Sequence, residues 1–175
     1  MGSKIVIILL VLTFFSGCTL FSPRESESPQ GDDFWITPFS PSIAVENFVN
    51  SFNYKDPTNY VRILTDSFQF TGYAPDTFGS GGLFQNWDLS QEEDYIERLF
   101  DSGDSVSLLL IDSLKDSSNY SAQFYYSYTV HHQNTAQGLL LFSLVSDFSE
   151  MWYINKIEDL GGTSVSWTEL RKYYY

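Results

Sequence analysis

The period of the hydrophobic pattern changes near Ser105, and this change constrains the fold more than any other feature of the chain. Before it, apolar residues recur every three or four positions, which is the spacing of amphipathic helices. After it, apolar and polar residues alternate over long stretches, as in strands with one buried face. These stretches span residues 106–115, 120–132, 137–147 and 151–159, and short polar turns separate them. Because short turns join antiparallel neighbours, this half of the chain predicts a four-stranded antiparallel meander.

The first half of the chain predicts three helices. Ser40 and Asp56 each stand before a proline, which is the signature of an N-cap followed by the first helical position. Ser90 and Glu93 indicate a capping box at the start of the third helix, which Gly103 ends. Helices are expected over residues 41–52, 57–64 and 90–102, with a short strand at 68–70 and a loop at 71–86. Helices followed by a meander predict an α+β domain with its helices on one face of the sheet.

The stretch 120–132 shows how that sheet is expected to be buried. One of its faces is apolar and largely aromatic, and it carries Tyr120, Ala122, Phe124, Tyr126, Tyr128 and Val130. Ser121, Gln123, Ser127 and Thr129 alternate with these residues on the other face. The aromatic face should therefore lie under the helices, while the other face is half polar. That second face is the one through which we expect a homodimer, if one forms.

The N-terminal residues indicate export and lipid attachment. Ile5–Phe15 is an uninterrupted apolar run of about half the ~20 residues that a membrane-spanning helix needs, so it is typical of a secretory signal. Phe15-Ser-Gly-Cys18 resembles the lipobox of bacterial lipoproteins, in which the signal is cut before the cysteine and the thiol receives a diacylglyceryl group. The alternative is an ordinary signal peptide followed by a chance cysteine. The resemblance implies that Cys18 is lipidated.

The domain organisation follows from this interpretation. Residues 1–17 are predicted to be the lipoprotein signal peptide, and residues 18–38 the lipidated N-terminus with a flexible acidic linker. Residues 39–175 are expected to form a single domain, large enough to bury a substantial core. Phe34, Trp35 and Ile36 are too apolar for a linker and should mark where the chain first touches the folded body.

Charge excludes some partners and favours others. The chain has a formal net charge of −13, which argues against nucleic acid and against electrostatic attraction to anionic headgroups. Acyl chains then remain as the predicted attachment to a membrane, provided that at least two are present. The expected location is the cell envelope. Thr19, in place of Asp after the cysteine, resembles lipoproteins that reach the outer membrane of cells with two membranes.

The order of the elements and the closing motifs resemble the nuclear transport factor two-like superfamily (SnoaL-like, cone-shaped α+β). The stretch from Leu64 to Phe70 follows the two first helices, and a lone helix precedes the long strands. Residues 151–159 (MWYINKIED) resemble the family strand W-x-I-x-x-W-x-D, with Ile157 in place of the second tryptophan. Residues 166–173 resemble the closing segment of exported members. The resemblance covers residues 41–175 and implies helices on a curved, mainly antiparallel sheet of four to five strands; cystatin-like proteins share this shape.

Enzymes of this superfamily place an Asp or His and a Tyr inside the cone, so the resemblance makes certain titratable residues candidates. Asp66, Asp112, His131 and His132 are such residues here. Asp112 shares a strand face with leucines, and burial there would raise its pKa; the alternative is an Asp112 that is wet or paired with Lys or Arg. His131 and His132 are adjacent on a strand, so they point to opposite faces and are expected to be ordinary surface residues.

Two further patterns in the sequence do not match a metal-binding or phosphate-binding motif. The acidic residues between Glu92 and Asp104 lack the spacing of a calcium loop, and they are explained by the helix dipole. The glycines at 79–82 lack the lysine of a phosphate-binding loop. We therefore predict no catalytic residue, no metal site and no cofactor.

Two functions remain open. In the first, the domain is non-catalytic and binds a small apolar ligand or another protein. In the second, it is a cone-fold enzyme of the isomerase, hydrolase or lyase type that acts on a small hydrophobic substrate. The first is favoured because a fold alone does not imply an activity. Trp152, Ile154 and Trp167 are predicted core residues. The candidate pocket lining is Phe48, Phe52, Phe68, Phe70, Asp112, Phe124, Tyr126 and Tyr128.

Overall fold

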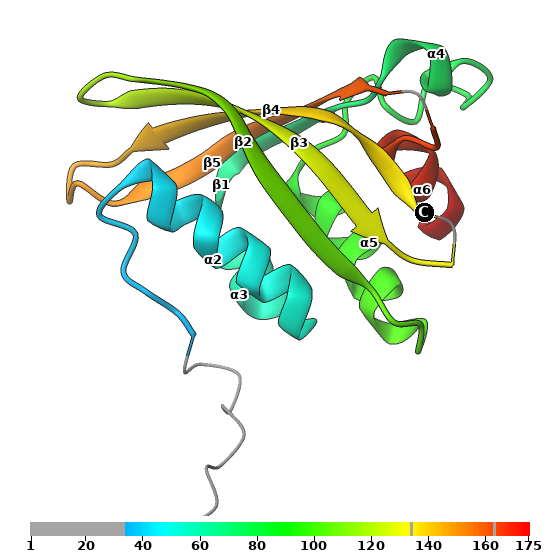
Figure 1. Cartoon of the computed structure of the whole chain (residues 1–175), viewed down its shortest axis with the longest axis horizontal. Coiled ribbons are helices and arrows are strands. Elements are labelled where there is room, and N and C mark those ends of the chain that lie inside the picture. Colours follow the sequence, from blue (N-terminus) through cyan, green and yellow to red (C-terminus); the bar gives the residue numbers. More distant parts are fainter. Residues whose placement is uncertain (1–33, 134, 163) are drawn as a thin grey trace, which may run out of the picture. The chain divides into compact units, whose positions relative to one another are not determined.

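The computed structural model describes residues 34–133, 135–162 and 164–175. Its elements are α2 (Pro41–Tyr54), α3 (Pro57–Arg62), β1 (Leu64–Thr71), α4 (Ala74–Thr77), α5 (Leu89–Asp101), β2 (Ser107–Ser117), β3 (Ser121–His131), β4 (Ala136–Ser146), β5 (Trp152–Gly161) and α6 (Trp167–Tyr174) (Figure 1). The predicted signal segment, Cys18 and the linker up to residue 33 lie outside the described residues. Within the described ranges, no helix has both the length and the hydropathy to cross a membrane.

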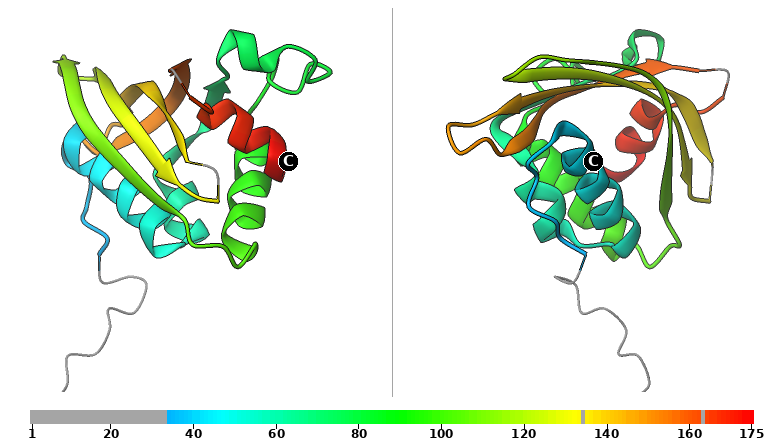
Figure 2. Two further views of the ribbon diagram at one scale, coloured as in Figure 1. Left: turned by 45° about the vertical axis from the view of Figure 1, so that its right-hand side comes forward. Right: turned by 60° about the vertical axis from the view of Figure 1, so that its left-hand side comes forward.

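One mixed sheet of five strands forms the framework of the domain, in the order β1-β5-β4-β3-β2. Strands β2 to β5 are antiparallel neighbours, as their short connections predicted. Strand β1 pairs parallel with β5 and makes the sheet mixed. The sheet is curved, and α2, α3, α5 and α6 lie on its inner face (Figure 2). The predicted class, helices on one face of a curved, mainly antiparallel sheet, is confirmed.

The helix starts follow local capping chemistry. The side chains of Ser40 and Asp56 accept hydrogen bonds from backbone N–H groups of the first turns of α2 and α3, as predicted. The predicted capping box of α5 is wrong by two residues. Asp88, not Ser90, is the N-cap, and its reciprocal partner is the Gln91 side chain. Asp and Ser are both good N-cap residues, so residue type alone does not show at which of the two positions the helix begins.

The region 71–86, predicted as a loop, contains one short helix, α4. This helix has a proline in its first turn, where the missing N–H costs nothing and the fixed φ suits a helix. The loop prediction therefore missed one helical turn.

The core lies between the helices and the inner face of the sheet and consists largely of aromatic rings. The apolar face predicted for β3 is buried from Ala122 to Val130, whereas Tyr120 precedes the strand and is 74% exposed. Trp152, Ile154 and Trp167 are buried, which confirms their assignment to the core.

Residues 34–38, which the sequence analysis placed at the end of the linker, lie against α2. The Asn47 side chain makes a hydrogen bond to both backbone groups of Ile36: it accepts from the N–H at 3.0 Å and donates to the carbonyl at 2.5 Å. The Arg62 guanidinium lies over the Trp35 ring at 4.1 Å. These contacts fix the point at which the chain enters the folded body.

Candidate functional site

The interior of the cone is filled with side chains. Phe48 contacts the rings of Tyr60 and Phe142, with centroids 4.8 and 5.4 Å apart. Trp167 of α6 contacts Phe52 and Tyr128 of β3, each at 5.6 Å. All six residues are at most 2% exposed. Their interlocking leaves the space between the helices and the sheet packed rather than open.

A buried ion pair lies within this interior. Glu92 of α5 and Arg171 of α6 have fully buried side chains and form a bidentate pair. The two contacts are Nη2 to Oε1 at 2.6 Å and Nε to Oε2 at 3.2 Å. Tyr60 donates its hydroxyl proton to Oε1 at 2.6 Å, and the Trp87 indole N–H donates to Oε2 at 2.7 Å.

These four bonds occupy the acceptor capacity of the carboxylate, because an ionised carboxyl has about four lone-pair sites. Glu92 thus has no free lone pair with which to take a proton from a substrate. It is a structural or binding anion in this state, not a general base.

Aromatic rings surround the guanidinium of Arg171. Its central carbon lies 3.8 Å from the ring centroid of Phe70, 4.7 Å from that of Tyr95 and 4.8 Å from that of Trp167. Such faces attract a cation through their quadrupole. Among the described residues, no hydrogen-bond partner faces the buried Nη1 atom of Arg171.

Burial and mutual pairing set the charge states of this centre. Burial, together with the Glu92 carboxylate, raises the pKa of Tyr60 well above 10.0. Burial also raises the pKa of Tyr95. Burial lowers the pKa of Arg171, but Glu92 and the nearby tyrosines outweigh it and hold that pKa above its ordinary value. At neutral pH the phenols remain proton donors and Arg171 remains a cation.

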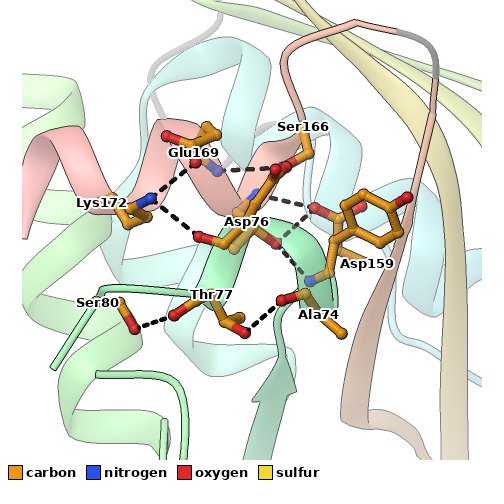
Figure 3. A network of polar contacts seen from close by, with 10 residues as sticks. Ala74, Asp76, Thr77, Ser80, Asp159, Ser166, Glu169 and Lys172 are labelled. Carbon is orange, nitrogen blue, oxygen red and sulfur yellow. Dashed lines mark hydrogen bonds and ion pairs between the residues drawn. The ribbon is translucent and has the colours of Figure 1, made fainter. Parts of the chain in front are cut away.

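Helix α6 is held in place by a second buried carboxylate, Asp159 of β5 (Figure 3). Its Oδ2 accepts from the backbone N–H and the hydroxyl of Thr168 at 2.8 and 2.7 Å. Its Oδ1 accepts from the N–H of Gly161 at 2.9 Å and the hydroxyl of Tyr128 at 3.2 Å. A carboxylate at the first turn also interacts favourably with the helix dipole. The aspartate of the family-like β5 motif therefore positions α6.

Short segments on either side of α6 also hold it in place. The Lys172 ammonium donates to the Asp76 carbonyl of α4 at 2.9 Å and to the Glu169 carboxylate at 2.7 Å (Figure 3). Gly161 turns the chain from β5 toward α6 with φ +75°, and a Cβ there would lie 2.6 Å from the Tyr73 ring. Only glycine suits both the conformation and the space at this turn.

A third polar cluster lies near the end of α6. His132 Nε2 is 2.5 Å from the Tyr174 hydroxyl and 3.1 Å from Asp104 Oδ2. Gln133 donates to the other oxygen of Asp104 at 2.8 Å, and this bond is the main reason that the pKa of Asp104 is lowered. An adjacent surface cleft of about 530 Å³ is lined by His132, Gln133, Val165, Glu169, Leu170, Lys172 and Tyr173.

The histidine prediction is therefore wrong for one residue of the pair. His131 is exposed at the end of β3, as expected. His132 has a side chain only 3% exposed, because the turn after β3 directs it toward Asp104 and α6. Contacts from distant segments cover it, and the local sequence does not show them.

The seven aromatic residues predicted to line a pocket are all buried in the core, at 0–4% exposure: Phe48, Phe52, Phe68, Phe70, Phe124, Tyr126 and Tyr128. Asp112 does not join them. Its side chain is 62% exposed and pairs with Lys115 at 2.8 Å. It lies opposite Tyr126 in the sheet, and a register shift follows it, so that Leu114 is also exposed. The prediction that Asp112 lines a pocket is therefore wrong, and the alternative, a solvent-exposed Asp112 paired with a lysine, is confirmed. Asp66 is exposed as well.

Sequence analysis missed Arg171 and wrongly explained Glu92 by the helix dipole alone, although the positions of both residues indicated burial. Glu92 precedes Ile96 by four residues and Leu99 by seven, which puts it on the buried face of α5. Arg171 follows Trp167 by four residues on α6. A charged residue at an apolar position on each of two helices is the pattern of a buried pair.

The fold is that of nuclear transport factor two-like and cystatin-like proteins. An NTF-2-like protein of unknown function from Shewanella oneidensis superposes with a TM-score of 0.53 at 14% identity, covering 66% of this chain and 91% of its own. A conserved protein from Planctomyces limnophilus gives 0.55 at 10%, covering 67% and 89%. A cystatin-like domain of unknown function from Nostoc punctiforme gives 0.52 at 10%, covering 69% and 74%.

No family model matches the chain, and no curated protein matches it in sequence. At these identities the structural similarity establishes the fold alone. The shape implied by the sequence resemblance is thus confirmed.

Proposed function

We propose that this chain is an exported lipoprotein, anchored in the cell envelope through Cys18, whose cone domain binds a partner and does not catalyse a reaction. One observation carries the non-catalytic part. Enzymes of the superfamily that the sequence resembles hold an acid–base pair in this interior. Here it is packed with rings around Glu92 and Arg171, and the Glu92 carboxylate already accepts four hydrogen bonds.

The N-terminal sequence supports the anchor. The apolar run Ile5–Phe15 leads to a lipobox-like tetrapeptide, and a chain with a net charge of −13 has little electrostatic attraction to anionic lipids. Replacing Cys18 by Ser should release the protein to the soluble fraction and abolish palmitate labelling. The matched control is Ser22→Ala in the linker, which keeps the anchor. Membrane association that persists in Cys18→Ser contradicts the proposal. In a cell with two membranes we expect the outer one.

The outer face of the sheet supports a protein partner, and we assign it to a second copy of the chain. Leu109, Ile111 and Leu114 of β2 are 51, 59 and 62% exposed, and Leu139 of β4 is 43% exposed. In the sheet they lie level with Thr129, Ser127 and Tyr125, which face away from the core. Exposed apolar side chains grouped on one sheet face are typical of an interface.

Sedimentation equilibrium tests this assignment. The protein should sediment as a dimer, and Ile111→Asp should sediment as a monomer. Phe148→Asp is the control, because Phe148 is an even more exposed apolar residue and lies in the β4–β5 turn, away from this face. A monomeric parent protein excludes the second copy as the partner.

The second candidate function is a cone-fold enzyme acting on a small hydrophobic substrate, and one observation favours it. His132, Tyr174 and Asp104 form a hydrogen-bonded cluster, and His132 lines the cleft beside α6. A histidine held by a carboxylate is the usual general base. Turnover of a small ketone or lactone that is lost in His132→Gln would establish the enzyme.

A further inference from the structure

We infer that the aromatic box around Glu92 is a binding site for an alkylguanidinium group, and that Arg171 of α6 occupies it as an internal ligand. The ligand class is an arginine side chain that follows an aromatic residue by four positions, as in α6 itself. This inference rests on the proposed function, because it takes the domain to be a binding module.

The part of the site outside α6 is complete without Arg171. Tyr60 of α3 and Trp87, which precedes α5, donate to the two oxygens of Glu92 at 2.6 and 2.7 Å. Phe70 of β1 and Tyr95 of α5 supply ring faces 3.8 and 4.7 Å from the guanidinium carbon. Neutral donors thus hold an anion inside an aromatic box, which is the chemistry that recognises an organic cation.

A guanidinium suits this box better than an ammonium does. The bidentate contact of Nε and Nη2 with the two oxygens of Glu92 uses the planar fork of the group. A compact ammonium lacks this planar fork, so it cannot hold the two oxygens in the same fixed geometry. The flat cation also stacks on Phe70, at 3.8 Å.

Arg171 satisfies most, but not all, of its hydrogen-bond donors in this site. Its buried Nη1 makes no hydrogen bond to any part of the chain that the structure describes. A buried charge pair adds little stability relative to apolar side chains of similar volume, so stability alone does not account for its presence. A recognition site filled by a ligand from its own chain accounts for both features.

The element that carries Arg171 is a short helix that contacts α4, α5, β4 and β5. Helix α6 has eight residues, and its outer side leaves Tyr173 75% exposed. It is joined to β5 through the glycine turn at Gly161 and Gly162. Local opening of this helix would expose the box to an equivalent arginine from another chain or to a smaller cation.

The first experiment is chemical rescue in the full chain. Arg171→Ala should have a lower thermal midpoint, and propylguanidinium should restore it in a saturable manner, by about 5 °C at ten times Kd. Propylurea, the uncharged analogue, should not. The matched control is the double variant Glu92→Gln/Arg171→Ala, in which propylguanidinium should also have no effect. If Arg171→Ala leaves too large a cavity to fold, Arg171→Met, which fills the space without the charge, measures the loss of stability. The second experiment, on the parent protein, then carries the binding test.

The second experiment distinguishes the source of the guanidinium. A synthetic peptide of residues 166–175 is added to the parent protein, and hydrogen exchange of the α6 amides is followed. The peptide should accelerate that exchange and bind about tenfold or more tightly than the same peptide carrying Arg171→Met. Rescue by propylguanidinium alone identifies a small cation as sufficient, and exchange by the peptide alone identifies a peptide source.

Absence of both rescue and exchange overturns the inference, as does equal binding of the arginine and methionine peptides. These results leave the proposed function separately testable. Release of Cys18→Ser from the membrane reports on the anchor, and absence of turnover reports on catalysis, whatever occupies the box.

Discussion

Glu92 concentrates the chemistry of this molecule in one residue. Its carboxylate accepts four hydrogen bonds, two from the cation and two from neutral donors, and its side chain has no contact with solvent. An ion in such a place is tolerated only because every part of it is paired. Removing one partner leaves the other as an isolated buried charge.

Glu92→Gln should therefore lower the free energy of unfolding by about 3–5 kcal/mol, the usual result of orphaning one member of a buried pair. The measurement is urea unfolding. Glu93→Gln is the control, because Glu93 is the next residue on the exposed side of α5 and should change stability little. Equal midpoints for the two variants would show that Glu92 is not paired as described.

The buried tyrosines give a prediction at alkaline pH. Burial raises the pKa values of Tyr60, Tyr95 and Tyr128 above 10.0 in the folded state. The folded state then keeps protons that the unfolded chain loses, so the stability contributed by these groups is complete below pH 10 and declines as the pH rises further. Phenolate absorbance and circular dichroism should change together in one transition above pH 10. Titration of all tyrosines in a protein that keeps its native dichroism would contradict the burial.

At the scale of residues, the sequence predicted which single apolar side chains are buried, but it did not predict which charged side chains pair with each other. Trp152, Ile154 and Trp167 were assigned to the core from alternation and family-like spacing, which are local properties. Glu92 and Arg171 are 79 residues apart, so the helix spacing around each residue indicates burial but does not identify its partner. Asp112 was judged from its strand neighbours, but whether a helix covers that end of the strand depends on tertiary structure.

At the scale of elements, α6 fills the part of the cone interior that the other helices leave open. It places Trp167 and Arg171 inside, and its first turn is fixed by Asp159. Because Asp159 accepts from both β5 and α6, it couples the sheet to the helix. One carboxylate therefore fixes the first turn of α6 against β5.

Asp159→Asn should lower the free energy of unfolding by about 1–3 kcal/mol, since an amide cannot accept all four hydrogen bonds. Hydrogen exchange should rise more in α6 than in β3 or β4. Glu158→Gln is the matched control, because Glu158 pairs with Lys156 outside this network. A uniform rise across the domain would show that Asp159 has no special relation to α6.

Element positions were predictable where periodicity is strong. The four long strands and the first two helices appear close to their expected bounds, because alternation and proline-flanked caps are local signals. The parallel pairing of β1 with β5 joins segments far apart in the chain, so no turn chemistry indicated it. The start of α5 was misplaced because Asp88 and Ser90 are both suitable caps.

The whole domain combines a closed interior with an open sheet face. The concave side holds rings and one ion pair, while the outer side exposes leucines and an isoleucine on β2 and β4. The proposed binding at the outer face and the proposed exchange at the Glu92 box then take the place of the open pocket that the sequence allowed. The family shape alone does not distinguish these cases, because the filling of the cone is set by the segment after β5.

The environment of the Arg171 guanidinium tests the central claim, that the cone is closed by its own α6, most directly. In NMR spectra the Nε–H of Arg171 should exchange slowly with solvent and show NOEs to the rings of Phe70 and Tyr95, which lie against it. The exposed arginines Arg62 and Arg98 serve as internal references in the same spectrum. Exchange of Arg171 as fast as these references, without NOEs to the rings, would contradict a closed cone.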